Sequence, residues 1–191
     1  MRALRVFTLP LAAALIAFAA CNDNSFGLPT AVYGNVVDSV SLWALDGTPL
    51  NTPSGYSILG RLGGAAIVRT DQTTAYDFAF NITPSGQAVL LPTGALGLGK
   101  SSGIILQSEP FDSITVAPSS GYQDSVAVAV DSGSVAVLRS RPYTTCAVGV
   151  VYLYAKMQVL RVDTIARRID YNILVDLNCG YRGLEPGIPK R

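Results

Sequence analysis

The clearest alternation of apolar and polar positions lies near the C-terminus of the chain. From residue 169 to 177, one face holds Ile169, Tyr171, Ile173, Val175 and Leu177, and the other holds Asp170, Asn172, Leu174 and Asp176. A period of two is typical of a β-strand with one buried face and one solvent face. The run Val150–Val162 alternates in the same way. We therefore predict an antiparallel hairpin centred near Ile165, with Asp170 and Asp176 on its solvent face.

The rest of the chain consists of short apolar runs separated by Gly, Pro, Ser and Asp, such as the turn signals Asp46-Gly47 and Asp131-Ser132-Gly133. No run has the period of a long amphipathic helix, and no repeat is evident. This pattern favours an all-β antiparallel β-sandwich, with a partly closed β-barrel as the alternative. The further strands that we predict are Ala31–Val37, Val40–Leu45, Tyr56–Leu59, Ala65–Arg69, Tyr76–Ile82, Ala88–Leu91, Ile104–Gln107, Ser113–Val116, Val126–Val130 and Val135–Arg139.

The N-terminal segment has a different composition. Arg2 and Arg5 precede an apolar run from Val6 to Ala17, which is followed by small residues. This is the layout of a secretory signal peptide, and the run is too short to cross a membrane as a helix.

The end of that segment, Phe18-Ala19-Ala20-Cys21, resembles the lipobox of bacterial lipoproteins, with Phe18 in place of the usual leucine. The resemblance implies cleavage before Cys21 and acyl chains on its thiol, so that the protein is held at a membrane. It divides the chain into a signal peptide (1–20), a lipidated tether (21–29) and a single β-domain (30–191). In enteric lipoproteins an aspartate after the cysteine favours inner-membrane retention, so Asn22 leads us to expect the outer membrane. The alternative is an ordinary signal peptide with a chance cysteine.

The number of cysteines is consistent with an exported protein. If Cys21 carries lipid, two of the three cysteines remain, Cys146 and Cys179, in a compartment that permits disulfides. We predict a bridge between them, with two free buried thiols as the alternative. The predicted hairpin places Cys179 opposite Val151 rather than Cys146, so we expect a bend or bulge near Gly149.

Charge and the absence of histidine exclude several functions. Without residues 1–20, the 14 basic residues fall to 12, against 13 acidic ones. A net charge near −1 leaves no electrostatic footprint for nucleic acid. The chain contains no histidine, which removes the commonest general base and zinc ligand. We therefore expect no catalysis, no metal and no cofactor.

Two further sequence patterns are typical of functions that we do not expect here. Residues 94–101 match the phosphate-loop letters G-x-x-x-x-G-K-[ST], but a strand rather than a helix should follow, so we predict a surface connection and no nucleotide. The pairs Asp71 with Asp77 and Asp170 with Asp176 could serve a two-carboxylate hydrolase. Carboxylates are usually solvated charges, and we expect that here.

One strand face offers a candidate binding surface. Tyr152, Tyr154 and Lys156 point the same way, and exposed aromatic side chains can stack on sugars or anchor a protein partner. The alternative is packing under a loop. The leading hypothesis is a non-catalytic, lipid-anchored envelope protein whose β-domain binds a protein or glycan partner or has a structural role. A carbohydrate-binding β-sandwich comes second, and a two-carboxylate hydrolase third.

Overall fold

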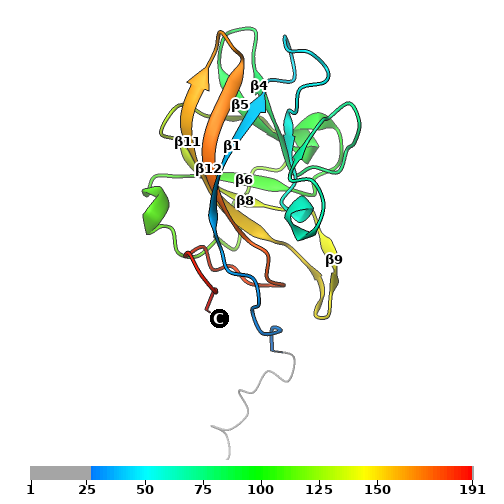
Figure 1. Ribbon diagram of the computed structural model, residues 1–191, viewed down its shortest axis with the longest axis vertical. Coiled ribbons are helices and arrows are strands. Elements are labelled where there is room, and N and C mark those ends of the chain that lie inside the picture. Colours follow the sequence, from blue (N-terminus) through cyan, green and yellow to red (C-terminus); the bar gives the residue numbers. More distant parts are fainter. Residues whose placement is uncertain (1–26, 191) are drawn as a thin grey trace, which may run out of the picture.

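The computed structural model describes residues 27–190, which form two five-stranded antiparallel sheets and a small separate hairpin (Figure 1). The first sheet contains β1 (Val37–Trp43), β12 (Arg168–Asp176), β11 (Tyr154–Asp163), β8 (Val135–Arg139) and β6 (Gly103–Gln107), in that order. The second contains β3 (Ile67–Val68), β2 (Gly55–Tyr56), β4 (Phe78–Ile82), β5 (Ala88–Pro92) and β7 (Val128–Ala129). The separate hairpin pairs β9 (Tyr143–Cys146) with β10 (Gly149–Val151), and three 3-10 turns complete the fold: η1 (Leu59–Leu62), η2 (Thr93–Leu96) and η3 (Phe111–Ser113).

The two sheets pack face to face, and neither closes on itself within the described chain, so the predicted β-sandwich is confirmed. An aromatic trio lies at the centre of the core between the sheets. The ring of Tyr56 is 5.6 Å from that of Phe78, and both rings are 6.2 Å from Tyr171. Tyr171 comes from β12 in the first sheet and the other two from the second, so the trio joins the layers.

The hairpin of β11 and β12 has the register that the alternation predicts. Tyr154 pairs with Asp176 and Val159 with Tyr171, which centres the hairpin at Ile165. A bulge follows, because the register shifts between Val159 and Arg161 and leaves Leu160 without a partner in β12. The core-facing residues of β12 from Ile169 to Val175 are buried, as predicted.

The opposite face of the first sheet does not meet solvent as predicted. Phe111, Ile114 and Ala117, from the segment after β6, pack there with Leu184 from the C-terminal segment. Beneath this layer Asp176 is fully buried, whereas Asp170, beyond its edge, is half-buried. The expectation of a solvent face is therefore wrong for Asp176. Local alternation cannot reveal that a distant loop forms a second layer.

Two predicted strands are absent from the described residues, and one strand was not predicted. Residues 31–36 run irregularly before β1, and only Asn35 forms an isolated bridge, with Gly187. In place of a strand over 113–116, η3 ends at Ser113, and Val116 forms an isolated bridge with Gly183. β9 has no predicted counterpart, because its sequence Tyr-Thr-Thr-Cys is too short for a clear apolar pattern.

Cys146 and Cys179 form the predicted disulfide, with their α-carbons 5.8 Å apart. The expected bend is present too. Gly149 has a φ of +95°, which favours glycine, and the pairing of β9 with β10 is irregular between Gly149 and Val151. The bridge therefore joins the β9–β10 hairpin to the segment that follows β12.

Cys21 and the rest of the expected signal peptide lie outside the described residues. Of the expected tether, residues 27–29 are described, and the Tyr181 hydroxyl donates a hydrogen bond to the carbonyl oxygen of Pro29 at 2.9 Å. Within residues 27–190, no helix has both the length and the apolar character needed to cross a membrane.

Candidate functional site

The candidate face of Tyr152, Tyr154 and Lys156 is not an open platform. The ring of Tyr154 packs on the second apolar layer and lies 6.3 Å from the ring of Tyr122. The guanidinium of Arg139 lies over the ring of Tyr152, 4.6 Å from its centre. Lys156 is 1% exposed, so the expectation that it belongs to an exposed face is wrong. Tyr154 and Lys156 pack under the 108–125 loop, the alternative interpretation of this pattern, whereas Tyr152 packs against Arg139.

Lys156 stabilises that loop instead. Its ammonium group donates hydrogen bonds to the carbonyl oxygens of Phe111 at 2.8 Å and Ile114 at 2.9 Å. Burial lowers the pKa of this lysine, while the charges of Asp112 and Glu185 oppose that shift. A buried cation needs such partners, because an unpaired charge in an apolar layer is costly.

Asp77 is a buried carboxylate, and both of its oxygens accept hydrogen bonds. Oδ2 accepts a bond from the Ile58 amide at 2.6 Å, and Oδ1 accepts bonds from the Arg141 amide at 2.6 Å and its Nε at 3.2 Å. Burial raises the pKa of Asp77, and the amide and guanidinium donors act against it. With 1% of its side chain exposed, Asp77 cannot touch a substrate. It joins the loop after β2 to the loop after β8.

The other candidate carboxylates also have structural partners. Asp71 forms an ion pair with Arg69 at 2.7 Å, and Asp170 forms one with Arg168 at 2.8 Å. Asp176 accepts bonds from the backbone and side-chain amides of Asn178 at 2.9 and 2.8 Å. Each carboxylate therefore has a role in the fold. Within residues 27–190 no group of three or more Cys, Asp or Glu side chains could hold a metal ion.

The phosphate-loop letters lie on a surface connection between β5 and β6. Residues 93–96 form the short turn η2, and Gly97 and Gly99 follow with φ of +72° and +89°. Lys100 is exposed, and β6 begins at Gly103. No α-helix follows the glycines, so the amide cradle of a phosphate loop is absent from this segment, as expected.

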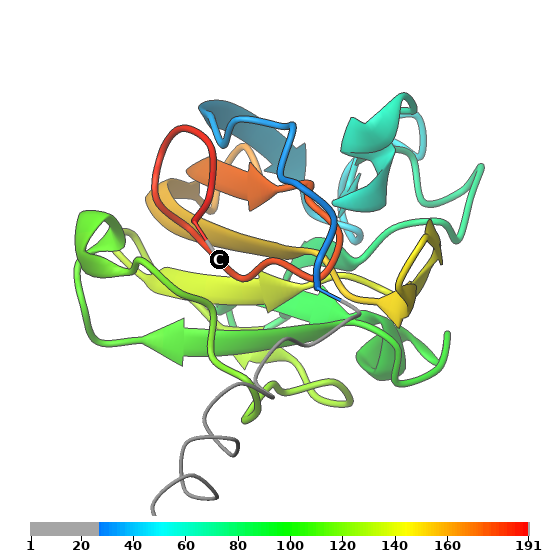
Figure 2. The same cartoon turned by 90° about the horizontal axis from the view of Figure 1, so that it is seen from below.

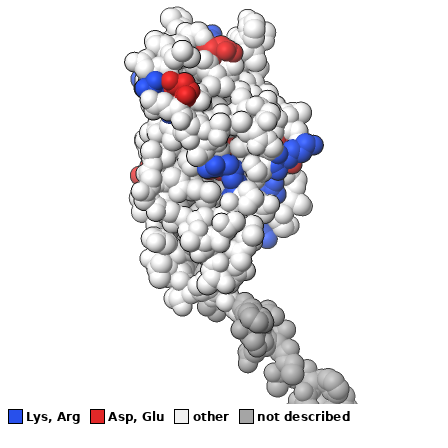
Figure 3. Space-filling model, turned by 90° about the vertical axis from the view of Figure 1, so that its right-hand side faces the viewer, with Lys and Arg blue, Asp and Glu red and all other residues white. Residues whose placement is uncertain are grey.

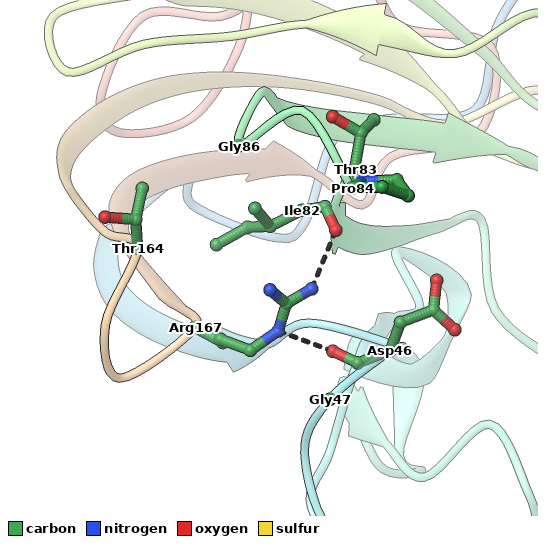
Figure 4. Close-up of a pocket in the computed structure, with 8 residues that line it drawn as sticks. All are labelled: Asp46, Gly47, Ile82, Thr83, Pro84, Gly86, Thr164 and Arg167. Atoms are coloured by element: carbon green, nitrogen blue, oxygen red, sulfur yellow. Dashed lines mark hydrogen bonds between the residues drawn. The ribbon is translucent and has the colours of Figure 1, made fainter.

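A different site lies where the turn of the β11–β12 hairpin meets the ends of β1 and β4 (Figure 4). The cavity has a volume of about 330 Å³. It is lined by Asp46, Gly47, Ile82, Thr83, Pro84, Gly86, Thr164 and Arg167. Four of its residues belong to the turn pairs Asp46-Gly47 and Thr83-Pro84, so chain reversals form most of its wall. We call this cavity the Arg167 pocket.

Arg167 is held rigidly in the pocket. Its Nε donates to the carbonyl oxygen of Asp46 at 2.6 Å, and one Nη donates to that of Ile82 at 2.7 Å. Figure 4 shows the carboxylate of Asp46 pointing away from the guanidinium, toward the outside of the pocket. No hydrogen bond from the second Nη is found among the described residues. The backbone of Arg167 has a φ of +53°, an uncommon conformation for a residue other than glycine.

The sequence did not predict a role for Arg167, because no neighbouring sequence feature indicates a binding site. The two carbonyl oxygens that it contacts are 121 and 85 residues away in the sequence. A guanidinium whose hydrogen bonds go to neutral carbonyl oxygens can also attract a carboxylate or phosphate group.

Searches against known protein families, curated proteins and solved structures gave no match to this chain.

Proposed function

We propose that this protein is a lipid-anchored domain of the bacterial cell envelope, held at the outer membrane through Cys21, that binds a partner and does not catalyse a reaction. The observation that carries the proposal is the Cys146–Cys179 disulfide. It accounts for two of the three cysteines and leaves Cys21, directly after Ala19-Ala20, as the cysteine without a partner in the chain. A disulfide is also typical of proteins that fold outside the cytoplasm.

Binding is favoured over catalysis because the polar groups that could act chemically serve the fold. Asp77 and Lys156 are buried and bonded, and Asp170 is paired with Arg168. The Arg167 pocket differs, because within the described part of the chain the hydrogen bonds of its cation go to neutral carbonyl oxygens, and the cation lines an open cavity. It also lies at the end of the domain opposite the first described residues (Figure 1). An anchored domain would thus present this pocket away from the membrane, to an acidic group on an envelope protein or glycan.

The anchor is tested by metabolic labelling with palmitate followed by membrane fractionation. The wild type should take up label and sediment with membranes, and Cys21→Ser should lose the label and leave the membrane fraction or stay unprocessed. The Cys146→Ser/Cys179→Ser double variant is the matched control and should keep the label, since it removes two thiols without touching the anchor. An unlabelled, soluble wild type would show that the anchoring proposal is wrong.

The pocket is tested by binding to arrays of acidic and neutral glycans and of envelope peptides. Arg167→Met keeps the length of the side chain but removes its charge, and it should abolish binding of any acidic ligand that the wild type retains. Arg161→Met is the matched control on the same hairpin, because Arg161 is exposed and pairs with Asp163 at 2.6 Å. Equal loss in both variants, or ligands without an acidic group, would rule out the pocket as the site.

A further inference from the structure

The end of the domain that begins at Gly27 is built from two segments far apart in the sequence. Val32 and Tyr33 donate backbone hydrogen bonds to the side-chain oxygen of Asn178 at 2.8 and 3.0 Å. Asn35 and Gly187 exchange backbone bonds of 2.7 and 2.9 Å. Figure 2, which views the domain from below, shows the first described residues and the C-terminal segment together at this end. We call residues 27–36 and 183–190 the proximal end.

Large apolar side chains are exposed on the proximal end. Val32 is 70% exposed, Val36 60% and Ile188 56%, and Tyr33 is 49% exposed. Exposed apolar residues are ordinary when scattered, but a group on one end points to a contact with another apolar phase. In Figure 3 the part of the domain nearest the first described residues shows no charged side chain on the face in view. The proximal end also holds two exposed charged residues of opposite sign, Glu185 and Lys190.

The short chain between the proximal end and Cys21 indicates that this apolar phase is the lipid bilayer. Cys21 is six residues before Gly27. At about 3.3–3.6 Å per residue, even a fully extended chain spans only about 20 Å. Acyl chains on Cys21 would therefore keep the proximal end beside the headgroups, while the β11–β12 turn lies at the far end of the domain (Figure 1). Valine and isoleucine gain from leaving water there, and tyrosine suits the boundary between headgroups and hydrocarbon.

We infer that the proximal end lies on the lipid surface, with the side chains of Val32, Tyr33, Val36 and Ile188 in the interfacial layer of the bilayer. The inference rests on the proposed lipid anchor and adds an orientation to it. Acyl chains alone would leave the domain free to tilt. A second, apolar contact at the proximal end fixes the domain upright and directs the Arg167 pocket away from the membrane.

The test uses the full-length lipidated protein in vesicles of phosphatidylethanolamine and phosphatidylglycerol that contain lipids with brominated acyl chains. Trp43, the one tryptophan, is first replaced by phenylalanine. Val32→Trp then reports on the proximal end. Ile165→Trp is the matched control, because Ile165 is 95% exposed at the opposite turn. The bromines should quench the Val32→Trp emission strongly, as for an indole at the interface, and leave Ile165→Trp nearly unquenched.

The outcomes separate the anchor from the orientation. If the protein floats with the vesicles but Val32→Trp is quenched no more than Ile165→Trp, the orientation is wrong and the anchor stands. If quenching or spectral shift of Val32→Trp depends on the ratio of protein to lipid, the apolar end contacts a second copy, which also overturns the inference. If the protein neither takes up palmitate nor floats, the anchoring proposal fails, and the orientation fails with it.

Discussion

The ammonium nitrogen of Lys156 donates a hydrogen bond to the carbonyl oxygen of Phe111 at 2.8 Å and lies 4.6 Å from the centre of the same residue's ring. One residue of η3 therefore offers this buried cation both its backbone acceptor and its aromatic face. The second hydrogen bond, to Ile114, closes the end of the turn. A lysine near the start of β11 thus holds the 108–125 loop on the outer face of the first sheet.

We predict that Lys156→Met destabilises the protein and loosens this loop. Methionine fills a similar volume but leaves two carbonyl oxygens without their donor, at a cost of about 1–3 kcal/mol. Urea unfolding should show the loss in free energy of unfolding. Limited digestion with chymotrypsin should cut faster after Phe111, which is buried in the wild type. Lys100→Met, at an exposed lysine, should change neither measurement. A Lys156→Met protein as stable and as resistant as the wild type would contradict this role.

The second prediction concerns pH and Asp176. Burial raises the pKa of this carboxyl group above its ordinary value of 3.8, and the amides of Asn178 and Gly183 oppose the shift. Between 3.8 and the raised pKa, the unfolded chain has released this proton while the folded chain keeps it. Stability contributed by Asp176 is therefore present below pH 3.8 and is lost as pH rises through the folded pKa. The pKa of Asp77 is raised as well, so Asp77 also makes the free energy of unfolding fall as pH rises.

Asp176→Asn should flatten the fall in stability from pH 4 toward neutrality, leaving only the part due to Asp77. Urea midpoints measured across that range give the slope. Asp170→Asn on the same strand is the matched control. The hydrogen bond from Arg168 lowers the pKa of Asp170, and the hydrogen bond from Ser41 adds to this shift. The pH dependence that Asp170 gives to the free energy of unfolding therefore lies below pH 3.8. A slope above pH 4 that is unchanged in Asp176→Asn would refute the assignment.

The sequence predicted those parts of the fold that rest on local pattern. β11 and β12 alternate over many residues, so their pairing and centre at Ile165 could be predicted, and β8 matches its predicted bounds. The second layer could not be predicted, because Lys156 and Asp176 occupy positions that alternate as solvent positions would. Their burial depends on Phe111 and Leu184, which come from distant segments. Arg167 was missed for the same reason, since its partners are brought to it only by the packing of the two sheets.

The third prediction concerns residues 94–101. Lys100 is exposed on a loop between two strands, so Lys100→Ala should change the free energy of unfolding by less than about 0.5 kcal/mol, as is usual for surface substitutions. Titration with ATP and magnesium should give no binding in either the wild type or the variant. Magnesium-dependent ATP binding that disappears in Lys100→Ala would show that residues 94–101 form a nucleotide-binding phosphate loop.

The last prediction concerns the disulfide, which joins the β9–β10 hairpin to the segment after β12. Cys146 ends β9, and Cys179 follows β12, so the bridge fixes the β9–β10 hairpin to the C-terminal segment. The cysteines are 33 residues apart, and closing a loop of this size restricts the unfolded chain by about 3–4 kcal/mol. Cys146→Ser/Cys179→Ser should therefore lose about 2–4 kcal/mol, with residual structure in the unfolded state reducing the effect.

Mass spectrometry of the digested, non-reduced protein should recover the peptides of Cys146 and Cys179 joined. Gly149→Ala supplies a second measurement at the same hairpin. The φ of +95° at Gly149 strains any residue with a β-carbon, although open space surrounds it, so the cost should be about 1 kcal/mol or more with the bridge intact. Because the bridge limits how far the hairpin can separate from the domain, Gly149→Ala should loosen the hairpin further in the double serine variant. Free thiols in exported protein, or a double variant as stable as the wild type, would show that the bridge does not hold this end of the fold.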